Sequence, residues 1–274
     1  MLSETIRKIC YTTKTKGRVN LSRIIAVANQ KGGVGKTTTT INVAAYLAKN
    51  GARVLLCDLD PQGNTSSGLG IDKSALQHGL YEVLIGGTDP AGVIVQTEFK
   101  NLSLLPTTSS LAAAEVELAT RPRREYSLQA VLQKLDYDYI FIDCPPSLGL
   151  LTLNGLVAAD SLLIPVQAEY YALEGLGQLL QTVKRVRQML NPKLHILGVV
   201  VTMYDGRTSL GGQVTEELKK HFGALVFDSR VPRNIRLAEA PSHGKPIVYY
   251  DRFCRGAMAY KRLSKEISSR VSTK

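Results

Sequence analysis

The sequence predicts a doubly wound α/β fold, in which helices cover both faces of a mostly parallel β-sheet. Two observations predict it. Short apolar runs typical of buried strands alternate with stretches in which apolar residues recur at helical spacing. In addition, a turn rich in glycine and lysine joins the first strand to a helix, which is the arrangement of a phosphate-binding loop. A chain of 274 residues can build one such domain with a large core.

Composition argues against several other classes of protein. Charged residues make up 21% of the chain and hydrophobic residues 44%, as in soluble globular proteins. Apolar runs stay well below the roughly 18 residues of a membrane span, and we find no secretory signal. The four cysteines lack the spacing of a zinc site or a disulfide framework, so we expect a reducing cytoplasm.

The net charge of +11 is concentrated at the two ends of the chain. Residues 1–23 carry six basic and one acidic side chain (+5), and residues 230–274 carry eleven and three (+8). Residues 24–229 carry seventeen and nineteen (−2). Clustered basic charge favours a polyanionic partner, either nucleic acid or anionic lipid. Because residues 1–22 hold few large apolar side chains, we predict a flexible tail there and a single domain at 23–274.

The phosphate-binding loop is predicted at residues 29–38, between a strand at 24–28 and a helix at 40–48. Its glycines let backbone N–H groups converge, and the helix adds the positive end of its dipole. Lys36 is expected to reach the β- and γ-phosphates of ATP, and the Thr37 hydroxyl to bind Mg²⁺. The nucleotide contacts expected from this loop are Lys31, Gly32, Gly33, Val34, Gly35, Lys36, Thr37 and Thr38.

The loop departs from the usual G-x-x-x-x-G-K-[ST] pattern, because Gln30 replaces the first glycine and an additional lysine, Lys31, follows it. This form resembles the deviant Walker A motif of the ParA/MinD group of ATPases. In that group the additional lysine reaches across a dimer interface to the phosphates bound by the partner subunit. The resemblance therefore implies catalytic roles for both Lys31 and Lys36.

Two carboxylates mark the end of the second predicted strand, at residues 53–58. Asp58 is its last residue, and Asp60 follows in a turn. The carboxyl ends of parallel strands form the ligand crevice of a doubly wound sheet, although an Asx turn before Pro61 is a purely structural alternative. The segment also resembles the switch I region of the ParA family. By that resemblance Asp60 holds the attacking water, Asp58 supports the metal through water, and Pro61 contacts the nucleotide.

A third strong strand, at residues 139–143, ends in Asp143. A carboxylate at this position suits the water shell of Mg²⁺. Many ATPases carry a glutamate base at the next position, whereas this chain has Cys144, which we expect to pack in the core. The missing base favours Asp60 for the water-activating role and predicts slow hydrolysis, which suits a switch.

The alternation of strands and helices continues along the chain. Further strands are predicted at 102–105, 161–166 and 197–203, and further helices at 80–85, 111–119, 128–135, 173–190 and 214–222.

Several motifs closely resemble those of the chromosomal ParA/Soj partition ATPases, and the resemblance runs from about residue 24 to residue 265. Besides the loop at 29–38, the motifs include the segments at 58–64, 142–147, 169–175, 204–208 and 231–242. The resemblance implies a homodimer that forms with ATP and binds double-stranded DNA without sequence preference. It also implies a ParB-type centromere-binding partner that stimulates slow ATP hydrolysis and release. Such a protein acts in the cytoplasm at the nucleoid and segregates a chromosome or plasmid.

The same resemblance assigns residues near the base and the DNA. The loop around Pro232 and Asn234 is expected to hold the adenine. Arg207 and Arg236 match positions at which family members carry DNA-contacting arginines. Additional candidates for DNA contacts are Arg233, Lys245, Arg252 and Arg255.

A membrane-associated positioning ATPase of the MinD type is the alternative function. It requires a C-terminal amphipathic membrane helix, and the last predicted helix carries Ala257, Tyr260, Leu263 and Ile267 on one side. A single stripe of this kind is more typical of a docked terminal helix, so we expect no membrane binding. A nitrogenase-type protein would need cysteines that bridge an iron–sulfur cluster between subunits, and no suitable partner for Cys144 is evident.

Overall fold

The computed structural model describes residues 22–169 and 172–272. The predicted tail at 1–22 lies outside these residues except for its last position, and so do residues 170 and 171 of the predicted motif at 169–175.

One sheet organises the described residues. Its strands are β1 (Arg23–Val27), β2 (Val54–Asp58), β3 (Val95–Gln96), β4 (Leu102–Leu105), β5 (Tyr139–Asp143), β6 (Ser161–Gln167) and β7 (His195–Thr202). The helices are α2 (Lys36–Lys49), α3 (Asn64–Gly68), α4 (Leu80–Leu84), α5 (Pro90–Val93), α6 (Leu111–Ala119), α7 (Ser127–Leu132), α8 (Leu150–Ala158), α9 (Ala172–Met189), α10 (Ser209–Phe222), α11 (Ile235–Glu239), α12 (Ile247–Tyr250) and α13 (Arg255–Ser272).

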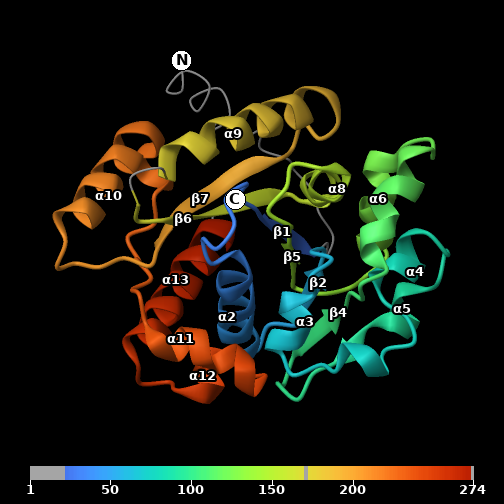
Figure 1. Ribbon diagram of the computed structural model, residues 1–274, viewed down its shortest axis with the longest axis horizontal. Coiled ribbons are helices and arrows are strands. Elements are labelled where there is room, and N and C mark those ends of the chain that lie inside the picture. The colour runs from blue at the N-terminus through green and yellow to red at the C-terminus, as the bar shows by residue number, and fades with distance from the viewer. Residues whose placement is uncertain (1–21, 170–171, 273–274) are drawn as a thin grey trace.

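The strand order is β3-β4-β2-β5-β1-β6-β7, with β3 antiparallel to β4 and the other neighbours parallel (Figure 1). This confirms the predicted fold. In the register of the central strands, Asp143 lies opposite both Val27 and Asp58. The carboxyl ends of β1, β2 and β5 therefore meet at one edge of the sheet.

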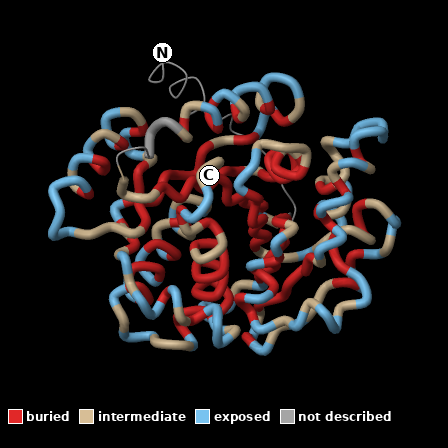
Figure 2. The backbone as a smooth tube through the Cα atoms, in the orientation of Figure 1, coloured by how far each residue is buried: buried red, intermediate tan, exposed pale blue. Residues whose placement is uncertain are grey.

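Alternate side chains of each central strand enter the two halves of the core. On β1, Ile24 and Ala26 pack with α4 and with α6 to α10, whereas Ile25 and Val27 pack with α2 and with α11 to α13. In Figure 2 the central strands and most of α2 are coloured as buried, and exposed residues lie on the surrounding helices and loops. Helices thus cover both faces of the sheet, and the apolar runs without alternation reflect strands that are buried on both sides.

The last helix packs its apolar stripe into the core. Ala257, Tyr260, Leu263 and Ile267 are at most 1% exposed, and the Tyr260 hydroxyl lies 3.1 Å from the Thr39 hydroxyl on α2. The helix is docked in the core as expected, with this stripe buried. Among the described residues, no helix is long and apolar enough to cross a bilayer.

Some helices differ from their predicted bounds. α10 begins at Ser209 rather than at 214, because Gly211 and Gly212 interrupt the apolar spacing. α7 ends at Leu132 rather than at 135, since the chain closes there in tighter turns between residues three apart. α8 was not predicted, because most of its residues are apolar and buried and no polar face reveals its period.

Candidate nucleotide site

The loop after β1 needs glycine at two positions. Gly33 and Gly35 have φ values of 72° and 82°, in the left-handed region that side chains disfavour, and Gly35 directly precedes α2. Gly32 is different, because a Cβ there would meet no described atom within 4 Å. Contacts within the subunit therefore do not require glycine at position 32.

Lys36 is folded back over this loop. Its side chain is only 7% exposed, and its Nζ donates to the Lys31 carbonyl at 3.3 Å. Burial lowers the pKa of Lys36, and the nearby carboxylates of Asp143 and Asp60 partly oppose that shift. A cation that is buried in the loop, beside the first turn of α2, suits an anionic ligand at the same place.

Asp143 accepts hydrogen bonds from three hydroxyl groups on two helices, α2 and α3. Its Oδ2 accepts hydrogen bonds of 2.7 Å from both Thr37 and Thr65, and its Oδ1 accepts one of 3.3 Å from Thr40. Burial raises the pKa of Asp143 to about 6, although the bonds from Thr37 and Thr65 act in the opposite direction. The carboxylate thus joins the phosphate loop to the end of β5.

Asp58 lies beside Asp143 and keeps one oxygen without a partner. Its Oδ2 accepts from the Ser66 backbone N at 2.8 Å and from the Ser66 hydroxyl at 2.7 Å. Its Oδ1 is buried and makes no hydrogen bond with the described residues. Burial, and next the charge of Asp143, raises the pKa of Asp58 to about 7.

These groups fit Mg²⁺. The ion prefers oxygen ligands and keeps several waters, so it is held by few direct protein contacts. The Thr37 hydroxyl, the Asp143 carboxylate and the unpartnered Asp58 oxygen form such a donor set at the loop. A divalent cation there would also offset the cost of burying two carboxylates.

Asp60 sits in the turn directly after β2. It is 7% exposed, and its Oδ1 accepts from the Gln62 backbone N at 3.0 Å. This contact is the Asx turn of the structural alternative, so the turn and a functional role share one side chain. The next position after Asp143 offers no base, because Cys144 is 1% exposed and burial raises its thiol pKa.

Lys31 is engaged within its own subunit. Its Nζ lies 2.9 Å from Oε2 of Glu169, which follows β6. Its backbone N donates to Asn29 Oδ1 at 3.0 Å, and the Asn29 amide donates to the Pro165 carbonyl at 2.7 Å. The loop is thereby fixed to the end of β6.

The predicted adenine loop pairs with the chain after β7. Tyr204 N donates to the Val231 carbonyl at 2.9 Å, and Arg233 N donates to the Tyr204 carbonyl at 3.2 Å. These bonds hold Pro232 against Tyr204. The Asn234 side chain caps α11 by accepting from the Arg236 backbone N at 3.0 Å, so its Oδ1 already has a structural role.

Comparison with known proteins places the chain in a family. A family model described as an AAA domain matches residues 22–196. The sporulation initiation inhibitor protein Soj of Bacillus subtilis is 55% identical over 251 residues, which cover 91% of this chain and 99% of that protein. The chain belongs to the ParA/Soj family. The chromosome partitioning protein ParA of Caulobacter vibrioides is 49% identical over 255 residues, or 92% and 96% of the two chains.

Solved structures agree with the predicted fold. Cobyrinic acid a,c-diamide synthase from Mycobacterium smegmatis, with bound ADP and magnesium, has a TM-score of 0.82 and 40% identity. The match covers 92% of this chain and 96% of that one. The cell division ATPase MinD of Pyrococcus furiosus has a TM-score of 0.74 and 28% identity, with coverages of 91% and 99%. A nucleotide and magnesium in the former match the predicted cofactors.

Both arginines that the ParA/Soj resemblance assigned to DNA carry carboxylate partners. The Arg207 side chain is 90% exposed. Its guanidinium donates to both carboxylate oxygens of Asp205, from Nε to Oδ1 at 3.0 Å and from Nη2 to Oδ2 at 2.7 Å. Arg236 lies 2.9 Å from Glu239 and 3.7 Å from Asp251. The other candidates are exposed, and they are Arg233, Lys245, Arg252 and Arg255.

Sequence reasoning missed several side chains at the nucleotide site. Thr40, Thr65 and Ser66 hold the two carboxylates, and Glu169 holds Lys31. Thr65 and Ser66 are buried on α3. They directly follow the segment at 58–64, and this position in the sequence could have indicated them. Glu169 was part of a family motif, but the sequence does not indicate its partner.

Proposed function

We propose that this ParA/Soj-family chain is an ATP-dependent DNA-partitioning switch. ATP binding drives formation of a sandwich homodimer, the dimer binds DNA without sequence preference, and slow hydrolysis, stimulated by a ParB-type protein, releases it. The convergence of Lys31, Lys36, Thr37, Asp60 and Asp143 at one sheet edge carries the proposal. Relatives named as chromosome-partitioning proteins support it. The protein then acts in the cytoplasm at the nucleoid.

In this proposal the loop binds the triphosphate through backbone N–H groups and two lysines. Lys36 exchanges its bond to the Lys31 carbonyl for phosphate oxygens. Thr37, Asp143 and Asp58 would hold Mg²⁺, which would neutralise phosphate charge when bound. Pro232 and Asn234 lie against the base.

Asp60 orients the attacking water in the proposed hydrolysis. Its carboxylate is close enough to Lys36 and Asp143 to influence both of their pKa values. Because Cys144 occupies the position after Asp143 where many ATPases carry a glutamate, Asp60 works without a second base. Slow turnover follows, and it keeps the ATP state long-lived.

Dimerisation is linked to ATP because the nucleotide lies between the two subunits. Lys31 leaves Glu169 and reaches the phosphates of the partner subunit, while Gly32 leaves space for the approach. A ligand that binds only the dimer stabilises the dimer. The dimer then presents two basic surfaces, which together bind DNA much more tightly than one.

Arg207 and Arg236 contact DNA phosphates in this account, with contributions from the other exposed basic residues. Each must exchange its own carboxylate partner for a phosphate. Such binding is indifferent to sequence and weakens as salt rises.

The test of the cycle is phosphate release from ATP by the full chain, measured alone, with random-sequence DNA, with a ParB-type protein, and with both. We expect turnover well below the roughly one per second at the slow end of common enzymes, and clear stimulation when both partners are present. Fast turnover that neither DNA nor the ParB-type protein changes would contradict the proposed switch.

A further inference from the structure

Thr202 connects the last strand of the sheet to the phosphate loop. It is the final residue of β7 and is only 2% exposed. Its Oγ1 donates to the Val34 carbonyl at 2.8 Å, across 168 positions of the chain. A Cβ at Gly35 would lie 3.9 Å from both Cβ and Cγ2 of Thr202. Thr202 therefore contacts the loop through a hydrogen bond at Val34 and through packing beside Gly35.

The orientation of the Val34 peptide matters for anion binding. Val34 lies between two glycines of positive φ, in the kind of turn that directs N–H groups into one anion-binding cavity. A carbonyl oxygen directed into that cavity would repel phosphate oxygens. Because Thr202 binds the Val34 carbonyl, this oxygen is directed toward β7, whereas the Thr37 hydroxyl is directed toward Asp143 on β5. β5 and β7 lie on opposite sides of β1 in the sheet.

The backbone of Thr202 is itself held on both sides. Its carbonyl accepts from Ala168 N at 3.0 Å, just after β6. The next residue, Met203, has a φ of 51°, which is uncommon for a residue with a side chain of this size. Such a conformation persists where the surrounding contacts fix the backbone, and here Tyr204 N donates to the Val231 carbonyl at 2.9 Å. The Thr202 hydroxyl is therefore presented to the loop from a fixed position.

This contact differs from the lysine contacts of the loop in the proposed nucleotide cycle. In that cycle Lys31 leaves Glu169, and Lys36 leaves the Lys31 carbonyl, because each ammonium exchanges a protein acceptor for phosphate oxygens. The Val34 carbonyl is an acceptor, as phosphate oxygens are, so bound phosphate does not compete for it. The bond from Thr202 can therefore persist while both lysines change partners.

We propose that Thr202 is a positioning residue for phosphate binding. Its hydroxyl holds the Val34 carbonyl away from the bound phosphates, so that the N–H groups of the loop face them. Thr202 acts through the Val34 peptide rather than through a contact with the nucleotide. This inference rests on the nucleotide site of the proposed function, but it requires neither dimerisation nor DNA.

Calorimetric titration of the full chain with ADP and Mg²⁺ tests this role. Thr202→Val keeps the shape of the side chain but removes the donor, so we expect the dissociation constant for ADP to rise about five- to tenfold. Thr202→Ser keeps the hydroxyl and should bind ADP within about twofold of the wild-type chain. Thr202→Cys has only a weak S–H donor, so its affinity should fall between those of the other two variants.

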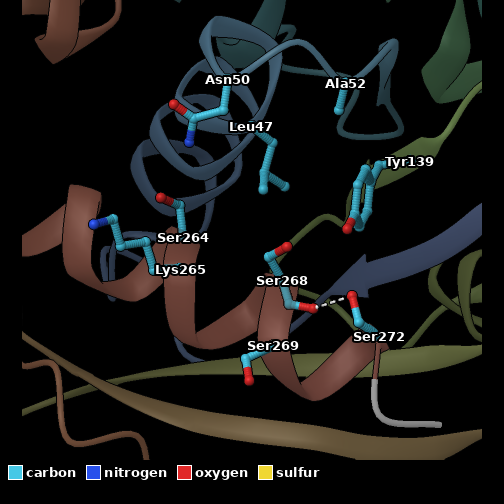
Figure 3. Close-up of a pocket in the computed structure, with 9 residues that line it drawn as sticks. All are labelled: Leu47, Asn50, Ala52, Tyr139, Ser264, Lys265, Ser268, Ser269 and Ser272. Atoms are coloured by element: carbon cyan, nitrogen blue, oxygen red, sulfur yellow. Dashed lines mark hydrogen bonds between the residues drawn. The ribbon is translucent and has the colours of Figure 1, made fainter.

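Two controls remove hydroxyl-to-carbonyl bonds of the same length, 2.8 Å, at other places. Thr215→Val alters a similarly buried threonine, whose hydroxyl donates to the Gly211 carbonyl within α10. Ser272→Ala removes the bond to the Ser268 carbonyl, which Figure 3 shows beside a cavity of about 410 Å³ at the far end of α2. Both controls should bind ADP as the wild-type chain does, whatever their melting temperatures.

The variants separate positioning of the loop from general packing. The proposal is overturned if Thr202→Val binds ADP within about twofold of the wild-type chain, or if Thr202→Ser binds as weakly as Thr202→Val. Equal weakening by Thr215→Val would also overturn it. If the valine variant does not fold, wild-type affinity in Thr202→Cys has the same meaning. A wild-type chain that does not bind ADP would overturn the nucleotide site itself, and this inference with it.

Discussion

The Lys31 ammonium and the Glu169 carboxylate form an ion pair of 2.9 Å that joins the loop after β1 to the chain after β6. Their side chains are 36% and 43% exposed, so breaking the pair costs little in free energy. In the proposed dimer Lys31 must leave Glu169 before it reaches the nucleotide of the partner subunit. The pair therefore competes with dimerisation.

Replacing Glu169 should favour the ATP dimer. Glu169→Gln keeps the shape of the side chain but removes the charge that holds Lys31, so we expect the dimer dissociation constant with ATP to fall about two- to fivefold. Sedimentation over a concentration series measures it. The control is Glu117→Gln, which alters a carboxylate that bonds Tyr81 instead. A weaker dimer for Glu169→Gln would mean that Glu169 itself acts within the interface.

A side chain at position 32 should block dimerisation without disturbing the subunit. A Cβ at Gly32 meets no described atom within 4 Å, so Gly32→Val should fold and bind ATP. The added methyl groups would meet the partner subunit, and we expect a monomer with ATP in light scattering. Gly92→Val is the matched control, because position 92 on α5 is equally open and lies away from the loop. An ATP dimer of normal affinity would refute the interface.

Loss of the Asp60 carboxylate should trap the ATP state. Asp60→Ala removes the group that orients the water, so we expect phosphate release to fall by at least about a hundredfold while ATP-dependent DNA binding persists. Phosphate release is measured in a single-turnover assay, and DNA binding with ATP is measured separately. The control, Asp72→Ala, removes an exposed carboxylate that caps a short turn and should hydrolyse ATP normally. Near-normal turnover by Asp60→Ala would assign the water to another residue.

The buried carboxylates predict how stability depends on pH. Burial raises the pKa of Asp58 to about 7 and that of Asp143 to about 6, against 3.8 for an ordinary aspartate. The folded chain without nucleotide then holds more protons than the unfolded chain across that window. The contribution of these two groups to the free energy of unfolding should therefore fall as the pH rises from about 4 to 7.

Mg²⁺ should reverse this trend, because it competes with those protons. We expect the rise in melting temperature on adding Mg²⁺ with ADP to be larger at about pH 8 than at about pH 5. Asp58→Asn tests the cause, since it should flatten the pH dependence measured without metal. A larger effect of Mg²⁺ at the lower pH would contradict the assignment of Asp58 and Asp143 to the metal site.

The sequence predicted those parts of the site that are continuous in the chain or fixed by strand ends. The glycine turn and Lys36 follow one another directly, and parallel pairing brings Asp58 and Asp143 together once both are placed at the ends of strands. The fold class followed for the same reason, because apolar runs and helical spacing are local patterns.

Contacts between distant side chains carried no such pattern. Lys31 meets Glu169 across 138 positions, and Thr65 meets Asp143 across 78. The same holds for the arginines. The sequence shows that basic charge is concentrated near the C-terminus, but it does not show that Glu239 and Asp251 pair with Arg236. α8 escaped prediction because a helix that is apolar on nearly all sides has no period to detect.

Binding to a random-sequence DNA duplex, compared with ATP and with ADP at low and physiological salt, tests whether the nucleotide controls DNA binding by this chain. Wild-type protein should bind tightly with ATP but not with ADP, and binding should weaken steeply as the salt concentration rises. Arg207→Ala and Arg236→Ala should each weaken it and reduce the salt dependence, whereas Arg53→Ala, which removes an exposed arginine paired with Asp136, should not. Equal binding with both nucleotides, or none with either, would contradict a nucleotide switch that acts on DNA.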